Sequence, residues 1–377
     1  MARSQLFKSS GTMESMSLVA RLYGNSPALI YVGLRLLDKG YEVRLATGPE
    51  EISAGSLRPV RLKASVVELL KEAFRRQARP YFFLEEAPAL SSWASVGSET
   101  QSGIFDRRAM LDRWVSSRAL SLELLELFRQ LGGRVETTPL VALPTGRGGV
   151  ALEIMDIDPA QLTLESVPSY FPHLERRPSL RCSEVWLPHV DALGNEPDFE
   201  FTRFEATLVL SEIHPEQGKV FSLHSSSEYS LQRALRALKD PRGSAPTAWK
   251  AQVLSERAPQ ERVSSQKWGF AGFYRPGVWS LGASVGKLGP ALNLDVSDSL
   301  SQGARLVETL EKLPRGQSLL LATEDWRRVE KARFVQAYRK ASFVERFFFA
   351  DGRGGDFVQW TSSLMPAKLR QLLKAPI

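Results

Sequence analysis

Residues 18–47 contain a glycine-centred turn of a kind that can bind the diphosphate of a dinucleotide. In the pattern G-x-G-x-x-G, the first glycine makes the turn, the second lets the diphosphate approach the backbone, and the third lets the helix pack closely on the strand. These positions are here Gly24, Ser26 and Leu29, and the acidic residue that normally accepts the ribose hydroxyls is replaced by Thr47. Leu29 is expected to push the helix away from the strand or to point into the diphosphate site. The turn glycine alone is kept.

The residues around this turn predict the elements that such a site requires. Leu18–Tyr23 is an apolar run typical of a strand, and the apolar spacing after Gly24 predicts an amphipathic helix. Lys39 and Gly40 end this helix before a second strand, Tyr41–Ala46. The start of the chain therefore predicts a βαβ unit.

The composition is that of an ordinary globular protein. The chain has 377 residues, of which 43% are hydrophobic and 24% charged, and its length favours two domains or one elaborate domain. The longest uncharged apolar run, Ala28–Leu34, is much shorter than the ~20 residues of a membrane-spanning helix. Residues 1–15 lack the apolar core of a secretory signal. We therefore expect a cytoplasmic protein without a transmembrane segment.

Basic residues outnumber acidic ones, which gives a net charge of +7 and a pI near 9.5. Such a charge favours acidic partners or peripheral contact with an anionic membrane surface. However, basic residues also alternate with acidic and apolar positions on expected helices such as Arg327–Lys340, a pattern typical of a solvated helix face. The sequence has no RNA-binding aromatic motif, zinc finger or helix-turn-helix pattern, so we expect no nucleic-acid binding.

The residue types that most often bind metals form no recognised motif. The single cysteine, Cys182, excludes an internal disulfide and lies in no Cys/His signature. All four histidines fall in one region, but their spacing matches no metal-binding pattern. They are His173, His189, His214 and His224. We expect neither a metal site nor a catalytic side chain.

Further along the chain, the spacing of apolar residues changes from one typical of helices to a two-residue period typical of strands. The expected elements are helices over 65–79 and 104–131, a strand from 134, a β-hairpin over 204–213 and 220–227, a helix over 228–238 and a C-terminal helix over 365–374.

Two later segments occur in a characteristic order after the βαβ unit. The first is RAMLDRWV, which starts at Arg108, and the second keeps Gly282, Gly286 and Pro290 after a strand. With these segments the chain resembles the FAD-dependent monooxygenases, tryptophan-type halogenases and geranylgeranyl reductases, which share the p-hydroxybenzoate hydroxylase fold. The resemblance is scattered over residues 16–140 and 264–312.

The departures from that family fall on residues that contact the flavin. The resemblance implies an aspartate at position 283 for the ribityl chain, and this sequence has Ala283. The glycine-rich helix start that approaches the flavin ring corresponds to Asn293–Asp295. Together with Ser26, Leu29 and Thr47, these replacements remove most of the expected FAD contacts.

The resemblance implies an α/β protein with a Rossmann-like FAD/NAD(P)-binding fold and an inserted antiparallel β-sheet domain. We expect the Rossmann-like domain to consist of residues 1–150 and 264–345, and the inserted, substrate-type domain of residues 151–263. Residues 346–377 form a C-terminal helical segment in this division.

We interpret the chain as a flavoprotein-like pseudoenzyme that has lost FAD binding and serves as a binding or scaffold component, with a protein partner, in a larger cytoplasmic assembly. The alternative is an active FAD-dependent oxidoreductase of monooxygenase, halogenase or reductase type with an atypical cofactor site. In that case the cofactor-binding residues are Gly24, Ser26, Arg108, Gly282 and Pro290. A third interpretation is that the pocket binds another ligand, such as an acyl chain or a nucleotide, and is lined by Trp114, Phe270, Phe273 and Trp279.

Overall fold

The computed structural model describes residues 19–47, 59–77, 113–137, 151–158, 179–187, 199–204, 207–214, 218–225, 227–239, 260–267, 269–272, 276–288, 295–313 and 318–349. Arg108, Phe273, Pro290 and the expected helix over 365–374 therefore lie outside the described residues.

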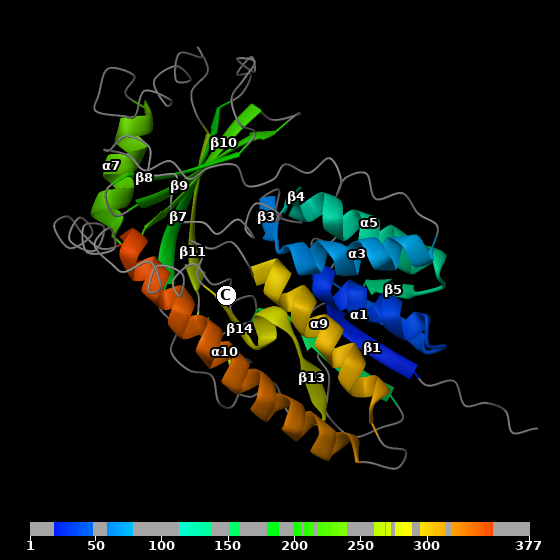
Figure 1. The fold of residues 1–377 in the computed structure, drawn as a ribbon. Helices are drawn as coiled ribbons and strands as arrows, with labels where there is room; N and C mark the ends of the chain where they lie inside the picture. Colours follow the sequence, from blue (N-terminus) through cyan, green and yellow to red (C-terminus); the bar gives the residue numbers. More distant parts are fainter. Residues whose placement is uncertain are drawn as a thin grey trace, which may run out of the picture.

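A parallel five-stranded sheet forms the centre of the larger part of the molecule (Figure 1). Its strand order is β13-β6-β1-β2-β5, and every neighbouring pair is parallel. The strands are β1 (Val19–Gly24), β2 (Glu42–Thr47), β5 (Arg134–Thr137), β6 (Ala151–Asp156) and β13 (Val278–Ser280). The predicted α/β fold with a parallel sheet is thus confirmed.

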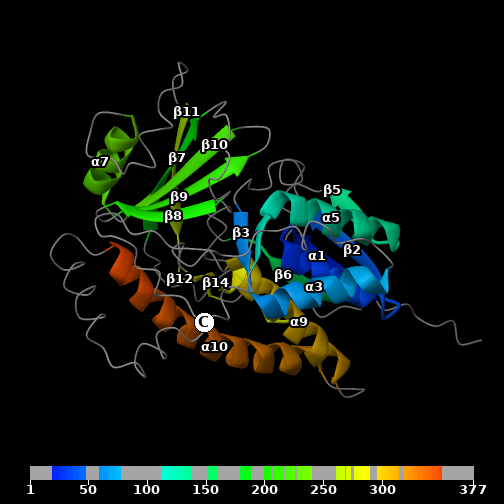
Figure 2. The same ribbon diagram turned by 45° about the horizontal axis from the view of Figure 1, so that its top comes forward.

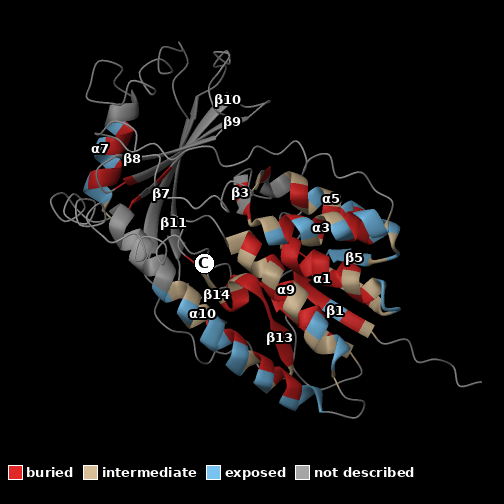
Figure 3. Cartoon of the chain, viewed as in Figure 1, coloured by how far each residue is buried: buried red, intermediate tan, exposed pale blue. Residues whose placement is uncertain are grey.

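Helix α1 (Pro27–Leu37) is buried almost along its whole length, since it packs on the sheet and is covered by helices α5 (Ser117–Gln130) and α9 (Asp295–Glu311). Figure 3 shows most of the α1 ribbon in the red of buried residues. Gly303 of α9 allows the close approach of α9, because a Cβ there would lie 3.0 Å from Val32 Cγ2. The predicted βαβ unit is confirmed by β1, α1 and β2.

The helix predicted over 104–131 is wrong at residues 113–116, and its residues 104–112 lie outside the described residues. The helix expected from residue 104 begins at Ser117, and the residues before it form strand β4 (Arg113–Ser116), which pairs antiparallel with β3 (Pro59–Leu62). Val115 and Val60 are register partners and both are buried. A β-branched residue with a buried cross-strand partner stabilises a strand. Helix α3 (Ala64–Arg76) follows β3, close to the predicted bounds.

A second five-stranded sheet is antiparallel, with the order β11-β7-β10-β9-β8. It contains the predicted hairpin as β9 and β10, although the strand expected over 204–213 begins at Thr207. The strands are β7 (Ser179–Leu187), β8 (Phe199–Phe204), β9 (Thr207–His214), β10 (Gly218–Ser225) and β11 (Gln260–Lys267). The predicted helix after the hairpin is α7 (Glu228–Lys239). That this sheet is an inserted, substrate-type domain remains a prediction, and the division made from the sequence counts β6 with it although β6 lies in the parallel sheet.

Helix α10 (Leu319–Phe349) runs past the open edge of β13 towards the antiparallel sheet (Figures 1 and 2). Trp326 fixes it to the parallel sheet, because its indole ring packs on Trp279 at 6.0 Å between ring centroids and its Nε1 donates to the carbonyl of Ser280 at 3.3 Å. Among the helices that the structure describes, none is long and apolar enough to cross a membrane.

Candidate functional site

The carboxyl ends of β1, β6 and β13 meet at one edge of the parallel sheet, where α/β proteins usually bind their ligands. The turn from β1 to α1 brings Gly24 and Ser26 to this edge. The single-turn helix η3 (Gly282–Ser284) follows β13 and brings Gly282 there. Three of the five predicted cofactor-binding residues therefore lie together, and the other two are outside the described residues.

Asp156, the last residue of β6, lies between these segments. Gly24 has φ +124°, and a Cβ at this position would overlap the main-chain carbonyl of Asp156. Gly282 has φ +47°, and a Cβ there would overlap the Asp156 carboxylate. Both glycines are thus required by the close approach of Asp156 as well as by their own backbone conformation.

Ser26 is the N-cap of α1. Its extended backbone and the proline that follows it start the helix, and its Oγ accepts a hydrogen bond from the backbone N–H of Leu29 at 3.1 Å. The same hydroxyl donates a short hydrogen bond to Asp156 Oδ2. The other carboxylate oxygen, Oδ1, accepts from the backbone N–H of Ala283 at 2.7 Å. Asp156 therefore connects the α1 N-terminus with η3.

The Asp156 side chain is almost completely shielded from water, with 6% of the residue exposed. Burial raises the pKa of its carboxyl group to about 6, although the hydrogen bonds from Ser26 and Ala283 and the charge of Lys287 lower it. The nearby Asp158 raises it further, and Asp158 is itself paired with Lys287 at 2.8 Å. Among the described residues Asp156 has no ion-pair partner.

The sequence does not predict Asp156 as a site residue, because the family resemblance implies the aspartate at position 283, which is Ala283 here. The available signal was an acidic residue directly at the carboxyl end of a buried strand, ALEIMD. Leu29 was also misjudged, since its side chain is fully buried in the core and does not point into the diphosphate site. Close packing of helix and strand occurs one turn later, at Gly33, where a Cβ would lie 2.7 Å from Leu22 Cδ1.

These residues do not fit FAD held in the usual way. The diphosphate of a dinucleotide binds at the N-terminus of the first helix, but here the Ser26 hydroxyl and the Ala283 amide already bind a carboxylate of the protein itself. The residue at the end of β2 is Thr47, which is 2% exposed and carries no charge for ribose recognition.

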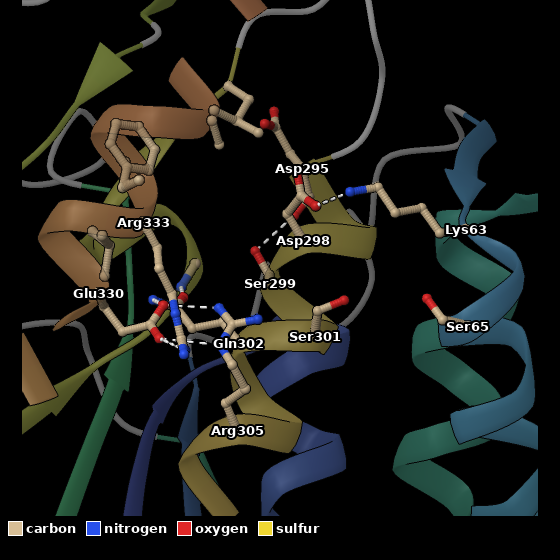
Figure 4. Close-up of a pocket in the computed structure, with 16 residues that line it drawn as sticks. Lys63, Ser65, Asp295, Asp298, Ser299, Ser301, Gln302, Arg305, Glu330 and Arg333 are labelled. Carbon is tan, nitrogen blue, oxygen red and sulfur yellow. Dashed lines mark hydrogen bonds and ion pairs between the residues drawn. The ribbon is translucent and has the colours of Figure 1, made fainter. Parts of the chain in front are cut away.

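A cavity of about 330 Å³ lies beside this edge, between η3, the first turns of α9 and the middle of α10 (Figure 4). Lys63 closes one side, because its Nζ pairs with Asp298 at 2.6 Å and its backbone N–H donates to Ser297 Oγ at 3.0 Å. Asp295 also lines the cavity, and burial raises the pKa of its carboxyl group to about 7. Lys287 lowers this pKa and the neighbouring Asp298 raises it.

The floor of the cavity is an ionic network around the buried carboxylate of Glu330 of α10. Arg305 binds both carboxylate oxygens of Glu330, at 3.1 and 2.8 Å, and Arg333 binds Oε1 at 2.8 Å. Gln302 donates to the same carboxylate at 3.2 Å and accepts from the backbone N–H of Gly282 at 2.7 Å. The network therefore joins the cavity to η3 and to Asp156.

Two of the four aromatic residues proposed for an alternative pocket, Trp279 and Phe270, have side chains that the structure describes, and neither lines the cavity. Trp279 is completely buried in the main core, so it does not line a cavity. Phe270 packs against Val285 and Phe334, with 5.8 Å between the two phenylalanine ring centroids, and Phe334 reaches the cavity instead. No group of three or more potential metal ligands occurs in the part of the chain that the structure describes.

Comparison with known proteins identifies the fold. No protein-family model and no curated protein sequence matches the chain. Among solved structures, HpxO from Klebsiella pneumoniae, complexed with FAD and uric acid, is 12% identical, with a TM-score of 0.65 over 95% of this chain and 96% of that chain.

Two further solved structures agree with this result. A triple mutant of the flavin-dependent brominase Bmp2 is 13% identical, with a TM-score of 0.63 over 95% of this chain and 97% of its own. PqsL from P. aeruginosa, in complex with 2-aminobenzoylacetate, is 10% identical, with a TM-score of 0.61 over 89% and 97%. The chain therefore has the fold of FAD-dependent monooxygenases and halogenases.

Proposed function

We propose that this protein is a binding component built on the fold of FAD-dependent monooxygenases, and that it does not hold FAD at the usual diphosphate position. The observation that carries the proposal is the Asp156 carboxylate, which accepts hydrogen bonds from the Ser26 hydroxyl at the N-terminal end of α1 and from the Ala283 amide of η3. A protein partner, a place in a larger assembly and a cytoplasmic location belong to the same proposal.

The electrostatics of the position support this proposal. A diphosphate next to the buried Asp156 would place like charges together in a region of low dielectric constant, where their repulsion is only weakly screened. Charge-assisted hydrogen bonds contribute about 1.5 to 3 kcal/mol each, and a bound FAD would lose those that an acid at position 47 normally supplies. The cavity lined by Asp295, Arg333 and Phe334 offers a separate space for a ligand.

The second candidate is an FAD-dependent oxidoreductase with an atypical cofactor site. Two observations favour it. The fold matches enzymes such as HpxO over nearly the whole chain, and Gly24 and Gly282 both remain at the carboxyl edge of the sheet. In this case Asp156 must turn away from α1 or take up a proton before the diphosphate can bind.

The absorbance spectrum of the purified protein distinguishes the two candidates. The protein is incubated with excess FAD, passed through a desalting column and scanned for the visible absorption of oxidised flavin. We expect no flavin to remain with the protein. Flavin retained in a one-to-one ratio would overturn the proposal and establish the second candidate.

A further inference from the structure

We propose that Asp156 is an internal substitute for a phosphate group, and that the Ser26 hydroxyl and the Ala283 amide form a phosphate-binding position that this carboxylate closes. The inference rests on the proposed function, because it explains why FAD does not bind there. It adds that the two donors keep the arrangement that a phosphate requires. They can therefore bind the phosphate of a nucleotide once the carboxylate is removed.

The geometry of the donors supports the first half of this inference. Each oxygen of Asp156 has its own donor, the Ser26 hydroxyl for Oδ2 and the Ala283 N–H for Oδ1 at 2.7 Å. Neither donor belongs to the strand that carries Asp156, so the carboxylate is bound by the two segments that flank it, as a free anion would be. The positive end of the α1 dipole lies at the same point.

The surroundings of Asp156 support the second half. Gly282 has no side chain, and the space that a Cβ would occupy is filled by the Asp156 carboxylate. Removing this side chain therefore opens room directly beside the two donors.

The charges near Asp156 determine whether a phosphate would be attracted to this position or repelled from it. Lys287 faces the position from β14 (Gly286–Lys287) and is bound to Asp158, which follows β6. Because these two charges offset each other, the negative charge of Asp156 is the main electrostatic obstacle to a phosphate. The raised pKa of the Asp156 carboxyl group agrees with an anion that neutral donors hold without a cation.

The inference is tested with ADP and adenosine as probes, by titration calorimetry of the full chain and of Asp156→Gly. We expect the wild-type protein to show no preference for ADP over adenosine. Asp156→Gly should bind ADP at least tenfold more tightly than the wild-type protein does, with adenosine unchanged. Asp325→Asn, which removes an exposed carboxylate on α10, is the matched control and should behave as wild type.

A double variant shows whether the gain comes from the proposed donors. Ser26→Ala combined with Asp156→Gly should lose most of the gain in ADP affinity. A gain that survives in the double variant, or that appears equally in Asp325→Asn, would overturn the inference. If Asp156→Gly does not fold, as judged by circular dichroism, Asp156→Ala, which also removes the carboxylate and leaves its space empty, is used in its place.

The results separate this inference from the proposed function. Retention of FAD by the wild-type protein would defeat both. Absence of FAD from the wild-type protein, together with folded Asp156 variants that gain no ADP affinity, would defeat the inference alone and leave the proposed function standing.

Discussion

Asp156 keeps a negative charge away from water with two neutral donors and without a cation of its own among the described residues. Such an arrangement stabilises the carboxylate less than solvent does, and this is why its pKa is raised. At the scale of single residues the site is therefore defined by an anion that the protein supplies itself. Its consequences for stability and for backbone geometry can be tested separately.

The stability of the protein should depend on pH through Asp156. An unfolded aspartate has a pKa near 3.9, and Asp156 in the folded protein has a pKa of about 6. The folded state binds the proton of the Asp156 carboxyl group more tightly than the unfolded state does. This proton therefore contributes fully to the free energy of unfolding below about pH 4, and the contribution is lost as the pH rises through about 6. We expect the free energy of unfolding of the wild-type protein to fall, relative to that of Asp156→Asn, by roughly 2 to 3 kcal/mol between about pH 4 and 7.5.

Urea denaturation at several pH values measures this difference. Asp325→Asn, which changes an exposed carboxylate, should leave the pH dependence as in wild type. Parallel pH profiles for the wild-type protein and Asp156→Asn would show that Asp156 is not the buried acid described here.

A comparison of Gly24 with Gly40 distinguishes the cost of a steric overlap from the cost of a side chain at positive φ. Both have positive φ, but a Cβ at Gly24 would overlap the Asp156 carbonyl, whereas a Cβ at Gly40 meets nothing within 4 Å. We expect Gly40→Ala to lower the free energy of unfolding by about 1 kcal/mol, and Gly24→Ala by about 3 kcal/mol or more. Equal losses in urea denaturation would contradict the close approach of β6 to the β1–α1 turn.

At the scale of elements, buried polar side chains hold α9 and α10 together beside the sheet. Glu330 is almost completely buried, and it binds Arg305 from the neighbouring helix and Arg333 from its own. Removing one member of a buried ionic network leaves the remaining charges without a partner, which is more costly than losing an exposed pair. The two helices that line the cavity therefore depend on this carboxylate.

We expect Glu330→Gln to lower the free energy of unfolding by about 2 kcal/mol, a value reduced because Arg305 and Arg333 are partly exposed. Glu308→Gln is the matched control, since Glu308 is an exposed residue of α9 that pairs with Lys312 at 4.0 Å. Its loss should be below about 0.5 kcal/mol. Thermal and urea denaturation of both variants would show whether the losses differ.

The elements that follow from local sequence could be predicted, and those that depend on distant partners could not. The βαβ unit is specified by apolar spacing, a turn glycine and a helix stop within about 30 neighbouring residues. Strand β4 forms only because β3 offers Val60 as a partner for Val115. The same limit explains why Asp156 was missed, since Ser26 and Ala283 lie 130 and 127 residues away along the chain.

At the scale of the whole molecule, the fold is stabilised by contacts that do not depend on a cofactor. Gly33 lets Leu22 and Phe128 pack against α1, and Trp326 joins α10 to β13 through Trp279 and Ser280. These contacts belong to the core, whereas Ser26, Thr47 and Ala283, three of the positions that depart from the family pattern, lie at or just after the carboxyl ends of β1, β2 and β13. The chain therefore keeps this fold at 12% identity to HpxO, and the fold alone does not determine the chemistry of the site.

This separation predicts how the whole protein responds to FAD on heating. A ligand present at about one hundred times its Kd stabilises the folded state by about 2.7 kcal/mol, which raises Tm by roughly 3 °C for a chain of this size. Because the Asp156 carboxylate is bound at the N-cap of α1, where a diphosphate would meet its negative charge, we expect saturating FAD to change Tm by less than about 1 °C. Differential scanning fluorimetry measures this change, and the same measurement with ADP is the comparison. With ADP, the Tm of Asp156→Gly should rise and the Tm of the wild-type protein should stay unchanged. A rise of several degrees with FAD in the wild-type protein would mean that the folded chain accommodates the cofactor despite Asp156.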